Sequence, residues 1–367
     1  MSENELIALL RLQQIPNIGD VNAKKLLDRC GSAEAIFEEK KNNLLKIDGI
    51  GTFTIQNLYD KEHLEAAVAE LEFTKKHNIE TLCFLDTAYP KHLKHCIDSP
   101  IVLFKSGAID LENRKIISVV GTRKITSYGQ AFCEEFIEAI APLDPIIVSG
   151  FAYGVDITIQ RAAIAHGLQT IGCLAHGLNQ VYPKVHKKYV AQVEKNGGFL
   201  TEFWSSSNPD RENFLKRNRV IAGMGEATIV VESAEKGGSL VTADIANSYN
   251  RDVFAVPGRT SDKYSIGCNN LIKQQKAQLL TSAAELVYLM GWQVDEQQER
   301  AVQKQLFVEL DETEQSIYSY LQLNGKQLLD TVALECKLPI FKVSATLLNM
   351  EMKGAIRPLP GKLFEAI

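Results

Sequence analysis

Hydrophobic residues gather into six short runs between residues 116 and 260, and these runs lack the polar alternation of half-exposed strands. Short continuous apolar runs are typical of strands that are buried on both faces of a sheet. The segments between them are long enough for crossover helices, so the pattern predicts an α/β fold, an open parallel sheet with helices on both faces. The runs are Ile116–Val120, Ile146–Val148, Thr170–Leu174, Phe199–Thr201, Thr228–Val231 and Val253–Val256.

Residues 1–80 show short helical patterns and two similar phrases, Ile15-Pro16-Asn17-Ile18-Gly19 and Ile47-Asp48-Gly49-Ile50-Gly51. Each phrase precedes an amphipathic segment, Val21–Leu27 and Thr54–Leu58. This predicts a small N-terminal helical domain of the helix-hairpin-helix or SAM-like type, whose glycine turns expose N–H groups that can hold a DNA phosphate. The 80 residues carry 14 acidic and 10 basic side chains, so a purely structural helical domain is an equally good interpretation.

The pattern changes again on either side of the predicted sheet. Residues 81–113 form a connector in which Ile101–Phe104 is a candidate edge strand, and the core domain covers residues 81–292. Residues 293–307 are polar and predict a linker. Residues 308–367 combine three helical patterns with a Pro360-Gly361 turn, which predicts a winged-helix-like domain. Its 8 acidic and 6 basic residues favour a protein-contact or structural role over DNA binding.

Glycines and cations follow the predicted strands at the positions where the strands end. Ligands bind at this carboxyl edge in open parallel sheets, and small residues let backbone N–H groups approach an anion. The sequence therefore predicts a site for phosphate groups. The segments concerned are Gly121-Thr122-Arg123, Ser149–Asp156 with Asp156 as a helix cap, His176-Gly177-Leu178, Lys216-Arg217-Asn218-Arg219 and Lys236–Thr242.

Composition narrows the setting of this site. The 367 residues have a net charge of −5, but residues 114–260 carry 16 basic and 14 acidic side chains, so any phosphate affinity is local to the core. No apolar run approaches the length of a membrane span, and the N-terminus is not a signal peptide. Seven cysteines with no Cys-x-x-Cys pair indicate reduced thiols, so we expect a cytoplasmic protein.

Catalytic signatures are missing from the sequence. It contains no Gly-x-x-x-x-Gly-Lys-Ser/Thr phosphate loop, no Gly-x-Ser-x-Gly elbow and no His-Glu-x-x-His zinc motif. His92 and His95 have a spacing that suits a metal but lack a third ligand, and Cys173 lies inside an apolar strand, which favours a structural cysteine over a thiol nucleophile near His176. We therefore expect a binding protein rather than an enzyme, with no metal and no cofactor.

The motifs VVGTRKITSYG, SGFAYGVD, LAHGLNQVYP, FLKRNRVIAG, VVESAEKGGSLVTADIA, VFAVPG and IGCNNLI follow one another across residues 116–275. Taken together they resemble the DNA-processing protein A (DprA/Smf) family. The resemblance implies a Rossmann-like core that binds single-stranded DNA without sequence preference and that forms a homodimer. It also implies delivery of the recombinase RecA onto single strands during natural transformation and recombination, protection of incoming DNA, and no enzymatic activity.

The resemblance also implies roles for individual residues. Arg123 would grip a phosphate, Phe214 would stack on a base, and the remaining positions would contact the backbone or close the pocket. One departure is Ala175-His176, where family members commonly have Gly-x, and it leaves that contact open. The implied DNA-binding residues are Gly121, Thr122, Arg123, Ser149, Gly150, Phe214, Lys216, Arg217, Asn218, Arg219, Gly237, Gly238, Ser239 and Thr242.

Two other functions compete with this one. A nucleotide phosphoribohydrolase of the lysine-decarboxylase-like type resembles the chain around Gly237-Gly238, although the proline and the later glycine of that motif are missing here. A scaffold protein that retains an unused pocket is the second alternative, because a charge run is most often a solvated face. The position of Lys216–Arg219 directly before Val220-Ile221-Ala222 argues for a functional cluster at the start of a buried helix.

Overall fold

Hydrophobic strands form the central layer of the larger of two structural units, Met1–Gln293 and Val294–Ile367. The computed structural model describes residues 1–292, 310–353, 355–359 and 363–366. The predicted linker 293–307 and the predicted turn at Pro360-Gly361 therefore lie outside the described residues. The predicted α/β fold class is confirmed by the sheet of the first unit.

All six predicted strands are present in a sheet of nine strands, counted over the described residues, with the order β1-β2-β6-β5-β4-β3-β7-β8-β9. Seven strands run parallel, and β1 and β2 pair antiparallel at one edge, so the sheet is mixed rather than wholly parallel. Every residue of the central strand β3 is buried, as its apolar sequence requires. The strands are β1 Glu80–Cys83, β2 Val102–Gly107, β3 Ile116–Val120, β4 Ile146–Ser149, β5 Thr170–Cys173, β6 Gly197–Thr201, β7 Ala227–Val230, β8 Asp252–Ala255 and β9 Gln278–Leu279.

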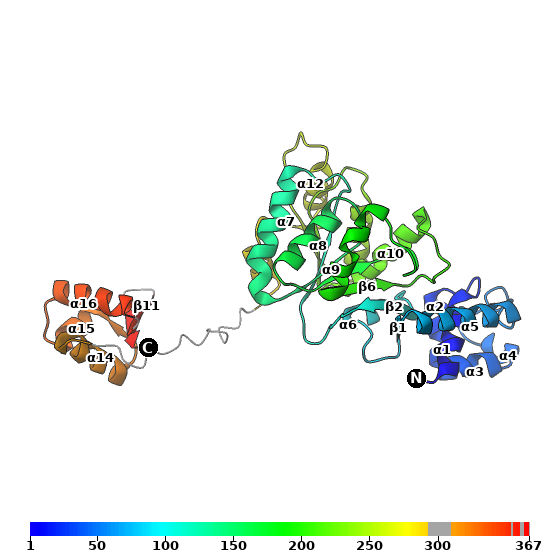
Figure 1. The fold of residues 1–367 in the computed structure, drawn as a ribbon, viewed down its shortest axis with the longest axis horizontal. Helices are drawn as coiled ribbons and strands as arrows, with labels where there is room; N and C mark the ends of the chain where they lie inside the picture. The colour runs from blue at the N-terminus through cyan, green and yellow to red at the C-terminus, as the bar shows by residue number, and fades with distance from the viewer. Residues whose placement is uncertain (293–309, 354, 360–362, 367) are drawn as a thin grey trace. The chain divides into compact units, whose positions relative to one another are not determined.

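Alternate residues of the strands face two separate hydrophobic clusters, and each cluster is covered by its own helices (Figure 1). One face packs on α6 Lys91–Lys94, α10 Arg211–Met224, α11 Gly238–Ser248 and α12 Ile266–Lys273. The other face packs on α7 Ser127–Ile140, α8 Val155–Ala165, α9 Val190–Lys195 and α13 Ala283–Leu289. Two short 3-10 helices, η1 Ala141–Leu143 and η2 Lys184–Tyr189, lie between them in sequence.

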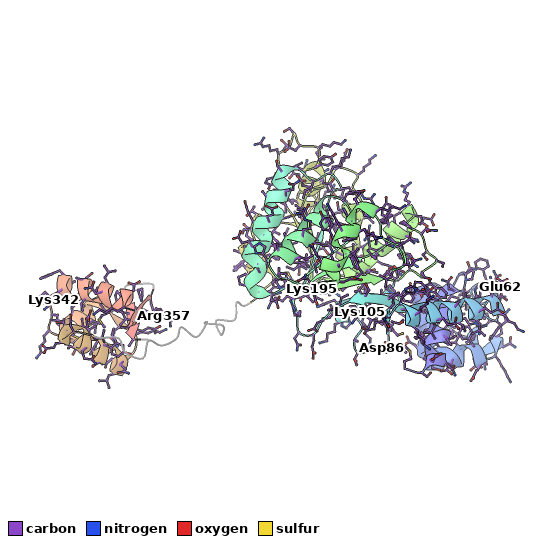
Figure 2. The ribbon with its side chains drawn as sticks, viewed as in Figure 1. Glu62, Asp86, Lys105, Lys195, Lys342 and Arg357 are labelled. Atoms are coloured by element: carbon purple, nitrogen blue, oxygen red, sulfur yellow. The ribbon has the colours of Figure 1, made fainter. Side chains whose placement is uncertain are left out.

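The N-terminal helices pack against the antiparallel edge of the same unit. Their apolar side chains share one cluster with residues of β1 and β2, including Cys83, Val102 and Phe104. Glu62 on α5 and Asp86 after β1 mark this part of the unit, and Lys195 marks the end of α9 (Figure 2). The helices are α1 Glu3–Gln14, α2 Asp20–Cys30, α3 Ala33–Glu38, α4 Lys41–Leu44 and α5 Lys61–Lys76.

The two predicted helix-hairpin-helix phrases have different structures. The first phrase, residues 15–19, is the turn between α1 and α2, as expected. After the second phrase, the predicted helix at Thr54–Leu58 is wrong, because residues 52–59 form turns. The apolar residues Ile55 and Leu58 still fill the N-terminal core, which explains their helix-like spacing.

A buried ionic cluster joins the N-terminal helices to the core. The guanidinium of Arg219 on α10 pairs with the carboxylate of Glu202 after β6, and its Nη2 lies 2.9 Å from Oδ2 of Asp20, the first residue of α2. The side chains of Arg219 and Asp20 are 9% and 10% exposed, and that of Glu202 is 1% exposed. Since buried charges are tolerated only when they are paired, this cluster fixes α2 relative to α10.

The second unit has the secondary structure of a winged helix. Its elements are α14 Glu312–Asn324, β10 Gln327–Leu328, α15 Leu329–Glu335, α16 Ile340–Met352, β11 Ile356–Leu359 and β12 Leu363–Ala366. The strands form a sheet of order β10-β12-β11 over one apolar core. On α16, Phe341 is 78% exposed and Leu348 is also exposed.

Replacing Arg219 by alanine should destabilise the first unit strongly. The change removes the buried cation that Asp20 and Glu202 share and leaves Glu202 only its ion pair with the exposed Lys216, and breaking a buried ion pair costs about 3–5 kcal/mol. We expect a clear fall in the urea midpoint, measured by circular dichroism and by tryptophan fluorescence, because Nε1 of Trp204 donates to Gln13 across the same boundary.

The matched control is Lys216→Ala. Lys216 pairs with the same Glu202 at 3.1 Å, but its side chain is 53% exposed. An exposed ion pair contributes about 0–1 kcal/mol, so the midpoint should barely move. Equal losses in the two variants would contradict the structural role given to Arg219.

Candidate nucleic-acid interface

A cleft opens at the carboxyl edge of the sheet, where the strand order reverses at β3. Strands β4, β5 and β6 lie on one side of β3, and β7, β8 and β9 lie on the other. The loops after β3 and β7 therefore diverge and leave a crevice between them, which is where open α/β sheets bind ligands. The cleft has a volume of about 540 Å³, and its lining includes Gly121, Thr122, Arg123, Asp156, Tyr182, Phe214, Arg217, Asn218, Ser233, Gly237, Gly238, Ser239 and Thr242.

The loop that carries Arg123 is held by backbone hydrogen bonds and by its close approach to Gly154. The amide N of Thr122 donates to the carbonyl O of Glu232 at 2.7 Å, and the amide N of Val155 donates to the carbonyl O of Thr122 at 3.1 Å. Gly154 has a φ of +76°, and a Cβ at this position would overlap the Thr122 carbonyl. Only glycine therefore lets the start of α8 approach this loop, and this approach positions Arg123.

The N-terminus of α11 faces the same cleft. Its N-cap is Gly237, and no side-chain oxygen caps the helix by accepting from its first N–H groups. A Cβ at Gly238 would meet nothing within 4 Å, which leaves room for a ligand beside the helix end. The Ser239 hydroxyl donates to Ser233 Oγ at 2.9 Å. An uncapped helix N-terminus with open space before it favours an anion.

An aromatic and cationic group forms the opposite wall. The Cζ atom of Arg123 lies 5.0 Å from the ring centroid of Phe214, and the Cζ of Arg217 lies 5.8 Å from it. The Tyr182 ring lies 5.6 Å from the Phe214 ring at an angle of 59°. Arg123 is exposed, and no carboxylate pairs with it among the described residues, so its guanidinium is free to meet an incoming phosphate.

Arg217 reaches the floor of the cleft from α10. It is buried and donates to the carbonyl O of Gly150 at 2.8 Å and to the carbonyl O of Cys173. Asp156 lies beside it. Burial raises the pKa of the Asp156 carboxyl and Arg217 opposes this rise, whereas burial lowers the pKa of Arg217 and Asp156 opposes that fall. Arg217 therefore brings a positive charge to the floor of the cleft, with the Asp156 carboxylate close to it.

Ten of the fourteen residues predicted from the sequence line the cleft, and four do not. The Ser149 hydroxyl donates to the Val119 carbonyl at 2.7 Å in the buried core, and Gly150 lies behind the Arg217 guanidinium. Lys216 and Arg219 point to Glu202, on the other side of α10. The structure places these four behind or beside the cleft, so they support its walls and do not face a ligand within it.

Two further details differ from the sequence predictions. Asp156 does not cap α8, because the N-cap is Gly154, and Oδ2 of Asp156 instead accepts from the amide N of Ala152 at 3.3 Å, near the charge of Arg217. Tyr182 was missed, although it lines the cleft and is 38% exposed. Its position at the carboxyl end of β5, in the loop before a proline, is the feature that could have identified it.

The described residues do not form a metal site. No group of three or more His, Cys, Asp or Glu side chains gathers into a metal site among the described residues, and Nε2 of His92 lies 3.8 Å from Glu226. None of the described helices has the length and apolar content to cross a membrane.

The fold and the cleft define a class: α/β proteins with a Rossmann-like sheet and a cationic cleft at its carboxyl edge. The family model described as DNA recombination-mediator protein A matches residues 80–291, and a model of the DprA winged helix domain matches residues 304–362. The chain therefore belongs to the DNA-processing protein A (DprA/Smf) family, and its second unit is a winged helix domain.

Individual relatives agree with this assignment. Protein Smf of Synechocystis is 28% identical over 398 residues, which cover 100% of each chain. The X-ray structure of DNA processing protein A from Streptococcus pneumoniae has a TM-score of 0.66 and 30% identity, and covers 78% of this chain and 98% of that chain. The structure of the Helicobacter pylori protein, described for its single-stranded DNA binding mode, has a TM-score of 0.52 and 27% identity, and covers 58% and 95% of the two chains.

Replacing Gly154 by alanine should destabilise the cleft more than its backbone angle alone explains. With a φ of +76° and a ψ of −124°, Gly154 lies in a sparsely populated backbone region that costs an L-residue about 1–3 kcal/mol, and the overlap with Thr122 adds to that cost. Gly167→Ala is the matched control, since Gly167 has a φ of +73° with nothing within 4 Å of an added Cβ. Thermal unfolding should show a larger loss for Gly154→Ala, and equal losses would contradict the close approach.

Proposed function

We propose that this protein binds single-stranded DNA without sequence preference, protects incoming DNA and loads the RecA recombinase onto it during natural transformation and recombination. The observation that carries the proposal is the cleft itself. An uncapped helix N-terminus, the free guanidinium of Arg123 and the ring of Phe214 face one space at the carboxyl edge of the sheet. Family membership and the single-strand binding described for the Helicobacter pylori protein support it.

Phosphate recognition follows from the charges in the cleft. Arg123 and the N-terminus of α11 both attract an anion, and neither distinguishes one base from another. Each phosphate that a cation neutralises releases counterions from the strand, so binding should weaken steeply with salt. Contacts to phosphate groups carry no sequence information, which accounts for binding that ignores sequence.

Preference for single strands follows from the aromatic side chains. Phe214 is half-buried and Tyr182 is exposed at the rim of the cleft, where unpaired bases can stack on their rings. A stacked base contributes about 1–3 kcal/mol whatever its identity. Bases of a duplex are already stacked and paired, so a duplex cannot offer a ring to this wall without unpairing.

Dimerisation through the core belongs to the same proposal. One cleft of this volume grips few nucleotides, and a dimer that holds one strand at two sites gains affinity through effective concentration. Sedimentation velocity of the protein, with and without a long oligonucleotide, measures whether two chains act together.

The nucleotide phosphoribohydrolase alternative remains an outcome of the same tests. Release of free base from AMP by purified protein would favour it over the DNA-binding proposal.

Replacing Arg123 or Phe214 by alanine should weaken single-strand binding without unfolding the protein. Fluorescence anisotropy of labelled oligo-dT measures the affinity at low and moderate salt, with a duplex of equal length for comparison. Phe214→Ala should cost about 1–3 kcal/mol through the lost stacking. Arg123→Ala should cost affinity and should also flatten the salt dependence by about 0.7 log units per lost phosphate contact.

Arg29→Ala is the control for the change of charge, because Arg29 is exposed at the end of α2 and does not line the cleft. It should bind as the unaltered protein does. If Arg123→Ala retained full affinity and an unchanged salt slope, the cleft would not be the DNA site. If the unaltered protein failed to bind oligo-dT, the proposed function would be wrong.

RecA loading should show as a shorter lag in RecA ATP hydrolysis on single strands coated with single-strand-binding protein. Unaltered protein should shorten the lag, and Arg123→Ala should shorten it less, because delivery requires the strand to be held. A lag that the unaltered protein does not change would remove RecA from the proposal and leave DNA binding standing.

A further inference from the structure

A positively charged segment lies next to the cleft and takes no part in it. Residues 151–195 contain five Lys or Arg residues and two acidic residues, so the segment carries 5 − 2 = +3 within a chain of net charge −5. Neither acid offsets the surface cations. Asp156 is buried beside Arg217, and Glu194 accepts a hydrogen bond from the Ser106 hydroxyl at 3.1 Å.

The geometry of η2 sorts its side chains by three-residue spacing. In a 3-10 helix, side chains three apart lie above one another. His186 and Tyr189 form the inward pair: His186 is buried, and its Nδ1 lies 2.9 Å from the Phe151 carbonyl O. Lys184 and Lys187 form an outward pair, and Lys188 lies on the third side, exposed like them. The exposed lysines of η2 therefore form a cationic ridge, and the inward rings of His186 and Tyr189 lie beneath it.

Aromatic side chains connect this ridge to the cleft. The His186 ring lies 5.1 Å from the Tyr153 ring and 6.0 Å from the Tyr189 ring. Tyr153 is 42% exposed and precedes Gly154, the residue that contacts the Arg123 loop. At the other end of the ridge, Tyr182 lines the cleft two residues before Lys184. The cleft and the ridge therefore form one continuous surface.

Arg161 joins the ridge from α8, which packs beside α9 on the same face of the sheet (Figure 1). Its Cζ lies 5.5 Å from the Tyr189 ring centroid, and Nζ of Lys188 lies 5.0 Å from the same centroid. Two cations therefore lie near the Tyr189 ring. Such contacts are stronger for cations that have lost water, and they place both charges close together.

An ordinary solvated charge run would be interspersed with acids. Lys216, Arg219 and Lys105 all have carboxylate partners within 3.1 Å, but none of the described carboxylates pairs with Arg161, Lys187 or Lys188. Arg161 and Lys188 lie near one ring and repel each other, and Lys187 adds a third unpaired charge beside Lys188 on η2. A polyanion would compensate these charges.

We propose that the ridge formed by Arg161, Lys184, Lys187 and Lys188 is a second, outer binding segment for the phosphate backbone of a single strand that leaves the cleft past Tyr182. This inference rests on the proposed function, since it extends the path of the same ligand. The cleft holds the first few nucleotides, and the ridge adds phosphate contacts only when the strand is long enough to reach it. The site therefore favours long single strands over short ones.

The test compares two strand lengths in the full-length protein. Anisotropy is measured with oligo-dT of about 6 and about 20 nucleotides, lengths on either side of a single short site. In the double variant Lys187→Ala/Lys188→Ala, affinity for the long strand should fall on the order of tenfold at 0.1 M salt, and its salt slope should flatten by about 1.4, which is two contacts at about 0.7 each. Affinity for the short strand should stay unchanged.

The control is Lys40→Ala/Lys41→Ala, an adjacent exposed pair with the same loss of charge, located at the start of α4. It should leave both affinities unchanged, and circular dichroism confirms that each variant is folded. The ridge is overturned if the Lys187/Lys188 variant binds the long strand as tightly as the unaltered protein, or if it loses both lengths equally. Failure of the proposed function looks different, since the unaltered protein would then bind neither strand.

Discussion

Two buried guanidinium groups on α10 set the geometry on which the cleft depends. Arg217 and Arg219 are both less than a tenth exposed, and a buried charge is stable only when it is paired and hydrogen-bonded. Arg217 is hydrogen-bonded to carbonyl groups at the ends of β4 and β5, and the nearby Asp156 carboxylate favours its positive charge. Arg219 satisfies the requirement through Glu202 and Asp20. One helix thus fixes the strand ends on one side and the N-terminal helices on the other.

Neighbouring residues of α10 therefore face different partners. Phe214, Arg217 and Asn218 lie on the side that faces the cleft, while Lys216 and Arg219 lie on the side that faces Glu202. A period of 3.6 residues per turn puts these two sets about half a turn apart. Four adjacent polar residues that look like a single cationic patch in the sequence are therefore two groups with different partners.

The sequence predicted the sheet well and the side-chain partners less well. Strands such as Ile116–Val120 are buried on both faces, so their apolar content alone identifies them. Gly121, Gly237 and Arg123 were placed correctly at the cleft, because the carboxyl edge of a parallel sheet follows from strand direction. The ion pairs of Arg219 were out of reach, because Asp20 lies 199 residues away in the chain and nothing local relates them.

Local patterns also misled where a tertiary contact overrode them. Thr54–Leu58 has helical spacing, yet the chain there turns while Ile55 and Leu58 remain in the core. Asp156 is a residue type that often caps helices, but its carboxylate accepts from the amide N of Ala152, and the close approach to Thr122 requires glycine at the true cap. Both errors have one cause, since spacing reports which residues are buried and not which groups they meet.

The distribution of charge links these constraints to the proposed function. The chain as a whole is acidic, so its average field repels DNA, and attraction is confined to places where cations lack partners. Of the buried arginines of α10, Arg219 is paired with carboxylates and Arg217 lies near Asp156, whereas Arg123 and the cations of η2 are exposed and unpaired among the described residues. The cations that stabilise the fold are thus buried, and those that can meet a ligand are exposed. Under the proposed function, the phosphates of a strand would meet the exposed cations of the cleft and of η2, which the fold does not pair with carboxylates.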